Sequence, residues 1–310
     1  LSSNLQPSHS LYFRADVGSS REEMRVRKIA RIASLTANEL YNRAMKAYYK
    51  GDFWNAYLLF MRILTEFPDF YKNDVVTYHA GSCLEEMDMR EEAIKTYISV
   101  KDNFGMSSQV PLADLGLMRI YYRQGAFSAV GNQFVELNKP GVPDSIRFHG
   151  CYIMGETELR QSENRKALQY FEIVPGDHPA YVFAQHTSST AHALLNSGMH
   201  IVAASLENCV ASKVVTREQK EIVNRSLVLL GYIFYEENAL SKAVSALRMV
   251  PPESYYYPDA LLGLGWTAIK ARQWNDCVAA GQSLAQASGK FIMQCEGALL
   301  QAYGLILQKK

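Results

Sequence analysis

A compact side chain recurs along this sequence at intervals of 34 to 40 residues, each time at the start of an expected helical run. A period of this size is typical of solenoids built from helix pairs, in which one unit cannot bury its own apolar face and neighbouring units must stack to form a core. The period therefore predicts an all-α repeat protein with an extended binding surface. The recurring positions are Ala56, Ala93, Val130, Ala167, Ala203, Ala243 and Cys277.

The first unit shows the underlying pattern most clearly. Apolar residues fall at three- and four-residue steps on both sides of Gly51 and Asp52, which predicts two amphipathic helices of about 12 to 14 residues joined by a turn. Pro68 is expected to end the second helix, because proline lacks the backbone donor and clashes with the preceding turn. The apolar positions are Leu40, Ala44, Tyr48, Phe53, Ala56, Phe60 and Ile63.

This pattern resembles the tetratricopeptide repeat family over roughly 250 residues, in seven units. The resemblance implies an all-α, right-handed superhelical solenoid of antiparallel helix pairs. Small residues at positions 8 and 20 of each unit would let its two helices approach closely, and an aromatic residue at position 24 would fill the gap against the next unit. Position 8 is occupied by Ala44, Gly81, Met118, Gly155, Ala191, Gly231 and Gly265, and position 24 by Phe60, Tyr97, Phe134, Phe171, Glu207, Leu247 and Gly281.

The repeat phase divides the chain into three predicted segments. Residues 1–36 form an irregular N-terminal segment with a charged lead-in helix, residues 37–288 form the TPR-like array, and residues 289–310 form a C-terminal capping helix. Met118 stands where a small residue is expected, and Glu207 stands where an aromatic is expected. We therefore predict a distortion or a shift of register in the third and fifth units.

Composition narrows the class of partner. The chain carries 32 basic and 31 acidic residues, a formal net charge of +1, so no global field draws it to nucleic acid or to an anionic membrane. No uninterrupted apolar stretch reaches the roughly 18 to 20 residues that span a bilayer, and we expect no direct membrane span. The five cysteines lack metal-ligand spacing and are expected to be free thiols, most of them in the core.

No motif for catalysis is present. The sequence lacks GxSxG, HExxH, P-loop and GxGxxG patterns, so we predict that the protein is not an enzyme and uses no cofactor and no metal. Adjacent carboxylates point about 100° apart on a helix, so Glu85 with Glu86 and Glu236 with Glu237 are expected to be solvated or groove-lining charges. Four histidines follow one another at steps that do not place two imidazoles on one helical face: His178, His186, His192 and His200.

The resemblance places particular positions of each first helix along a concave groove, and these positions are rich in tyrosine and arginine. Such side chains offer a large contact area at low entropic cost and are common anchors in protein interfaces. We therefore predict a groove that binds a protein partner. The predicted groove residues are Tyr41, Met45, Tyr48, Tyr49, Tyr78, Glu85, Arg119, Tyr122, Arg123, Tyr152, Arg160, Tyr232, Tyr235 and Trp266.

The predicted function is a non-catalytic scaffold for protein–protein interaction that holds a peptide, a helix or a folded partner. Residues 67–71 and 250–260 resemble inter-repeat joints of bacterial envelope proteins of the family. This resemblance implies an accessory subunit of an envelope, secretion or motility complex in the periplasm. Two alternatives stay open: a subunit of a large eukaryotic cytoplasmic or ciliary complex, and a helical-repeat protein that binds RNA.

Overall fold

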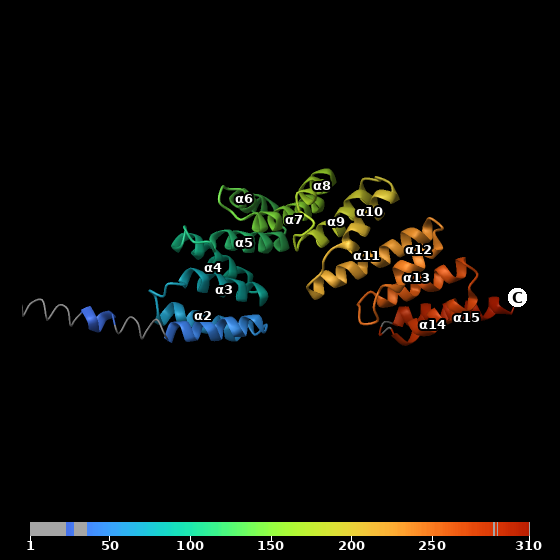
Figure 1. The fold of residues 1–310 in the computed structure, drawn as a ribbon, viewed down its shortest axis with the longest axis horizontal. Helices are drawn as coiled ribbons and strands as arrows, with labels where there is room; N and C mark the ends of the chain where they lie inside the picture. Colours follow the sequence, from blue (N-terminus) through green and yellow to red (C-terminus); the bar gives the residue numbers. More distant parts are fainter. Residues whose placement is uncertain (1–22, 28–35, 288, 290, 310) are drawn as a thin grey trace, which may run out of the picture. The chain divides into compact units, whose positions relative to one another are not determined.

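The computed structural model describes residues 23–27, 36–287, 289 and 291–309 (Figure 1). Contacts between Cα atoms divide the chain into two compact units, Leu1–Ala126 and Phe127–Lys310. Within the described residues both units consist of helices and connecting turns, with no strand. The predicted all-α architecture of helix pairs is therefore confirmed. The predicted N-terminal segment lies outside the described residues except for 23–27, which are helical, and residue 36.

The first unit contains two and a half helix pairs. Its first pair begins with a helix over residues 36–49, and each later helix packs against the helix before it. The helix α3 also packs against α5, so successive first helices lie side by side, as stacking of units requires. The remaining bounds are α2 Phe53–Glu66, α3 Asn73–Glu86, α4 Arg90–Asn103 and α5 Val110–Gln124.

The second unit continues the same alternation. Its first helices α7, α9, α11, α13 and α15 contact one another in sequence, and each contacts the helix that precedes it. The bounds are α6 Phe127–Leu137, α7 Asp144–Arg160, α8 Asn164–Glu172, α9 Tyr181–Leu194, α10 Met199–Ala211, α11 Arg217–Glu236, α12 Leu240–Arg248, α13 Tyr257–Lys270, α14 Trp274–Ala287 and α15 Phe291–Gln308.

A left-handed residue ends the first helix of every pair. Gly51 has a φ of 78°, and its amide donates to the Tyr48 carbonyl at 2.9 Å. A residue in this conformation stops a helix and turns the chain back, which is the role commonly taken by glycine. Most pairs achieve the same turn without glycine. The seven residues are Gly51, Asp88, Gly125, Ser162, Asn196, Asn238 and Arg272.

The close crossings predicted from the small residues are present. All the residues at positions 8 and 20 are buried. A Cβ atom added to Gly81 would lie 2.9 Å from the Tyr97 ring, and one added to Gly116 in the next first helix would meet the other edge of the same ring. The residue at position 24 thus fills the space between two units, as the repeat pattern predicts. Phe171 covers Gly155 and Leu247 covers Gly231 in the same way.

The structure shows the two repeats, the third and the fifth, that carry an unexpected residue. In the fifth repeat, Leu206 is buried at 1% exposure and Glu207 faces solvent, so the core position has moved by one residue along α10. The predicted shift of register therefore occurs there. In the third repeat, Met118 is fully buried at position 8, so α5 keeps the expected register there, and Gly116 of the same helix meets the Tyr97 ring of the preceding repeat.

Candidate functional site

Several predicted groove residues of the first unit pack between helices. The Tyr48 hydroxyl and Ser82 Oγ are 2.8 Å apart, and the Tyr48 ring meets the His79 ring edge to face. Tyr78 contacts the buried Tyr97 ring, with 5.9 Å between centroids. Tyr41 and Met45 are half-buried against the core of the first pair. These side chains pack between neighbouring helices, so only part of their surface is available to a partner.

Glu85 is buried and is the centre of a polar cluster. Its side chain is 3% exposed and accepts hydrogen bonds from Arg119 Nε at 2.8 Å and Arg119 Nη2 at 2.7 Å. The Tyr97 hydroxyl donates to the same carboxylate at 2.9 Å, and Arg123 Nη1 lies 3.7 Å from it. The sequence predicted a solvated or groove-lining charge at Glu85. Instead, a side chain 34 residues away pairs with it.

The ionisation of this cluster follows from its surroundings. Burial would lower the pKa of Arg119, but the hydrogen bonds and the charge of Glu85 raise it above its ordinary value. Burial, and then the charge of Glu85, raise the pKa of Tyr97. Arg119 therefore stays charged and Tyr97 stays a neutral donor. The cluster stabilises the junction of α3, α4 and α5.

Predicted tyrosines within residues 127–310 also join neighbouring helices of that unit. The Tyr232 hydroxyl donates to the Asp259 carbonyl at 2.9 Å, and burial, with the charge of Asp259, raises the pKa of Tyr232 to about 12. Tyr152 packs against the Phe171 and Phe183 rings, with centroids 6.2 and 5.9 Å away. Each of these side chains joins a first helix to a residue of a later helix.

Hydrogen bonds between neighbouring repeats recur with the period of the chain. The Ser254 hydroxyl donates to Glu221 across 33 residues, and Lys270 Nζ donates to the Tyr235 carbonyl across 35 residues. These hydrogen bonds were not predicted from the sequence, and those that end on a backbone carbonyl leave no signal in the pattern of side chains. Further examples are Tyr71 with Asn38, Ser107 with Asp74, and His178 with the Ser145 carbonyl.

A minority of the predicted groove residues reach solvent. Tyr49 is 77% exposed and Trp266 is 40% exposed. Arg123 and Arg160 are exposed at the ends of α5 and α7, and Tyr122 is half-buried. The groove as a binding surface stays a prediction, and these are the positions through which it can be tested.

The histidines and cysteines have structural surroundings. His186 Nδ1 lies 2.8 Å from Ser226 Oγ, and burial lowers the pKa of His186 to about 4. Within the described part of the chain, no group of three or more His, Cys, Asp or Glu side chains could hold a metal ion. None of the described helices is both long and apolar enough to cross a membrane. Four cysteines are buried and Cys295 is exposed.

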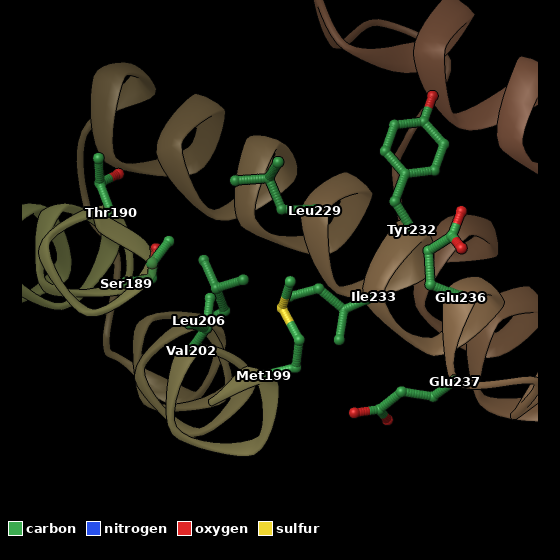
Figure 2. A pocket seen from close by; sticks show the side chains of 11 residues that line it. Ser189, Thr190, Met199, Val202, Leu206, Leu229, Tyr232, Ile233, Glu236 and Glu237 are labelled. Atoms are coloured by element: carbon green, nitrogen blue, oxygen red, sulfur yellow. The ribbon is translucent and has the colours of Figure 1, made fainter. Parts of the chain in front are cut away.

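An apolar pocket of about 500 Å³ opens between α9, α10 and α11 in the second unit. Figure 2 shows Met199 and Ile233 pointing toward one another, with Val202 and Leu206 beside them. Leu206 is 1% exposed at the floor, whereas Met199 is 59% exposed at the surface. The complete lining is Ser189, Thr190, Ala193, Met199, Val202, Leu206, Leu229, Tyr232, Ile233, Glu236 and Glu237.

The pocket has the size and the polarity of a binding site. Ligand sites are typically concave, about 300 to 1,000 Å³ in volume, and mostly apolar with a few polar groups. Here the polar groups are the Ser189 and Thr190 hydroxyls and the carboxylates of Glu236 and Glu237. Tyr232 lines it and was predicted as a groove residue, and Glu236 and Glu237, expected to be solvated or groove-lining charges, lie at its edge. The apolar lining residues, such as Met199 and Ile233, were not predicted, because their character is that of ordinary core packing.

A second apolar surface lies on α15. Leu299 and Tyr303 are 53% and 49% exposed, one helical turn apart. Terminal units of a solenoid normally carry a polar outer face. The outer face of α15 is apolar instead, and Ile292 and Ile306 extend it along the helix.

Solved structures with similar folds identify the architecture. A tetratricopeptide repeat protein from Parabacteroides merdae matches 86% of this chain and 99% of its own length, with 12% identity and a TM-score of 0.51. The C-terminal part of a TPR repeat-containing protein from Cytophaga hutchinsonii matches 83% of this chain and 98% of its own, with 12% identity and a TM-score of 0.56. The chain has the tetratricopeptide repeat fold.

The likeness to TPR proteins is one of structure. No protein-family model matches the sequence, and no curated protein matches it. At 12% identity the similarity establishes the TPR fold and does not carry over any partner. The function has to be argued from the surfaces of this chain.

Proposed function

We propose that this chain is a non-catalytic scaffold that binds a protein partner through the pocket between α9, α10 and α11. The observation that carries the proposal is the pocket itself, which combines a buried apolar floor at Leu206 with an open mouth at Met199 and Thr190. An apolar depression ringed by polar groups is the usual centre of a protein interface. The carboxylates of Glu236 and Glu237 at its edge would repel the phosphates of RNA, so a protein partner is favoured.

The test is site-specific photo-crosslinking in the native cells. A photoreactive phenylalanine analogue is placed at Thr190 or at Met199, which line the pocket, and at Lys166, which is exposed on α8, as a matched control. We expect a discrete protein adduct from the two pocket positions and none from Lys166. The same analogue at Tyr49 and Trp266 tests the predicted groove. A lack of adducts at all four sites would refute the scaffold.

We further propose that the complex belongs to the bacterial envelope and that the chain works in the periplasm. The support is the resemblance of residues 67–71 and 250–260 to inter-repeat joints of envelope proteins with this fold. Fractionation of cells carrying the full-length gene tests the compartment. Release of the protein with periplasmic markers on osmotic shock is the expected result. Recovery with cytoplasmic markers would refute the periplasmic assignment and favour a cytoplasmic complex.

A further inference from the structure

The C-terminal end of α11 is more acidic than helix electrostatics favours. The helix dipole places partial negative charge at a C-terminus, so cations are stabilising there and carboxylates are not. Nevertheless Glu236 occupies the last turn of α11 and Glu237 caps it, and this last turn contains no basic residue. Four other first helices of the array follow the favourable rule. Their last turns contain Arg123, Arg160, His192 and Lys270.

A carboxylate near the end of another first helix shows how such a charge is neutralised when its role is structural. At the end of α3, Glu85 is held by two hydrogen bonds from Arg119, which lies 34 residues further on. Lys270 follows Glu236 by the same 34 residues, but Lys270 Nζ donates to the Tyr235 carbonyl at 2.6 Å and lies 4.3 Å from the centre of the Tyr235 ring.

The carboxylates of Glu236 and Glu237 lack an ion-pair partner within the described residues. Among the described residues, neither Glu236 nor Glu237 has an ion pair, and both are exposed. Both line the apolar pocket (Figure 2). An apolar depression with two unpaired carboxylates at its edge is complementary to a molecule that carries apolar and cationic groups side by side.

We propose that the pocket takes a basic amphipathic segment of the protein partner. Apolar side chains of the segment enter between Met199, Leu206 and Ile233, and lysine or arginine side chains pair with Glu236 and Glu237. This inference rests on the proposed scaffold function and deepens it by naming the chemistry of the partner. Helices laid into apolar grooves commonly bind by side chains at three- and four-residue steps, with charges at the margin setting selectivity.

Defined peptides test the proposal on the full chain. The probe is a fluorescein-labelled helical peptide with leucines at i, i+3, i+4 and i+7 and lysines beside them. One matched peptide has every lysine replaced by glutamate, and another has every leucine replaced by serine. Fluorescence anisotropy should show the lysine–leucine peptide binding at least about tenfold more tightly than either matched peptide, with the preference for lysine shrinking as salt rises.

Two variants locate the binding. Glu236→Gln with Glu237→Gln should weaken the lysine–leucine peptide about tenfold and leave the glutamate peptide no weaker. The control is Glu91→Gln with Glu92→Gln, which changes the net charge equally at an exposed pair on α4 and should leave binding unchanged. Ala193→Trp, at an exposed lining position, should fill the pocket and abolish binding of the probe. Circular dichroism must show unchanged helicity for each variant, with Thr190→Trp as the substitute if Ala193→Trp misfolds.

The possible outcomes separate the inference from the proposed function. If the paired glutamine variant binds the lysine–leucine peptide like the unmodified chain while Ala193→Trp loses it, the pocket holds a partner but its carboxylates do not select it. That result overturns the basic segment and leaves the scaffold standing. If Ala193→Trp and Thr190→Trp both retain binding, or if no peptide is preferred, the inference is also overturned. The scaffold is then judged by the crosslinks at Thr190, Met199, Tyr49 and Trp266.

Discussion

Replacing Arg119 by methionine should destabilise the first unit by about 3 kcal/mol, because it leaves the Glu85 carboxylate buried without its main partner. Removing one member of a buried ion pair typically costs about 3 to 5 kcal/mol. The lower end applies here for two reasons. The Arg119 side chain is 33% exposed, so water reaches that side of the pair, and the Tyr97 hydroxyl still donates to Glu85. Arg123→Met is the matched control: Arg123 is 48% exposed, its contact is 3.7 Å, and its loss should cost less than about 1 kcal/mol.

The measurement is urea unfolding of the full chain, followed by the fluorescence of Trp54 in a background carrying Trp266→Phe and Trp274→Phe. A local probe is needed because repeat arrays do not unfold in a single two-state transition. Adding Glu85→Gln to Arg119→Met should recover at least about 1 kcal/mol, since it removes the buried charge. An Arg119→Met midpoint no lower than that of Arg123→Met would refute this account of the cluster.

Gly155→Ala should lower the free energy of unfolding by about 1 to 3 kcal/mol, because the added Cβ would overlap the Phe171 ring. The control Gly131→Ala lies in α6 with open space around it and should raise the free energy of unfolding by about 0.5 to 1 kcal/mol. Equal effects of the two substitutions in thermal unfolding would contradict the repeat phase. Burial, and then the charge of Arg225, lower the pKa of His186 from 6.5 to about 4, so the unfolded chain takes up the proton first as the pH falls. The stability that neutral His186 contributes is complete above about pH 6.5 and is lost between pH 6.5 and about 4. His186→Gln should therefore reduce the dependence of the unfolding midpoint on pH across that window. An unchanged pH dependence in the variant would contradict this role of His186. Mass spectrometry after brief maleimide labelling of the native chain should find the label at Cys295, which is exposed. Burial shields the other four thiols and raises their pKa: Cys83, Cys151, Cys209 and Cys277. Labelling of these four thiols at the same rate as Cys295 would contradict the fold.

The candidate site was predictable only in part. Tyr232 was identified from its repeat position, and it does line the pocket. Met199 and Ile233 have the same apolar character as dozens of core residues, and nothing in the sequence distinguishes a packed apolar side chain from one beside a cavity. The pair Glu236 and Glu237 was visible, but its significance depends on where α11 ends and on the direction in which Lys270 points.

By itself the sequence determined the fold of this protein. The spacing of Ala56, Ala93 and their successors, with glycines such as Gly81 and Gly155 at position 8, specifies where helices cross, because only compact side chains permit that approach. Only the tertiary structure decided which polar and aromatic side chains are free. Glu85, four residues after Gly81, is buried against an arginine from the next repeat, whereas Glu236, five residues after Gly231, faces solvent beside a pocket. The physical reason is that pairing depends on the direction of side chains about 34 residues away, which the local pattern of a helix does not encode.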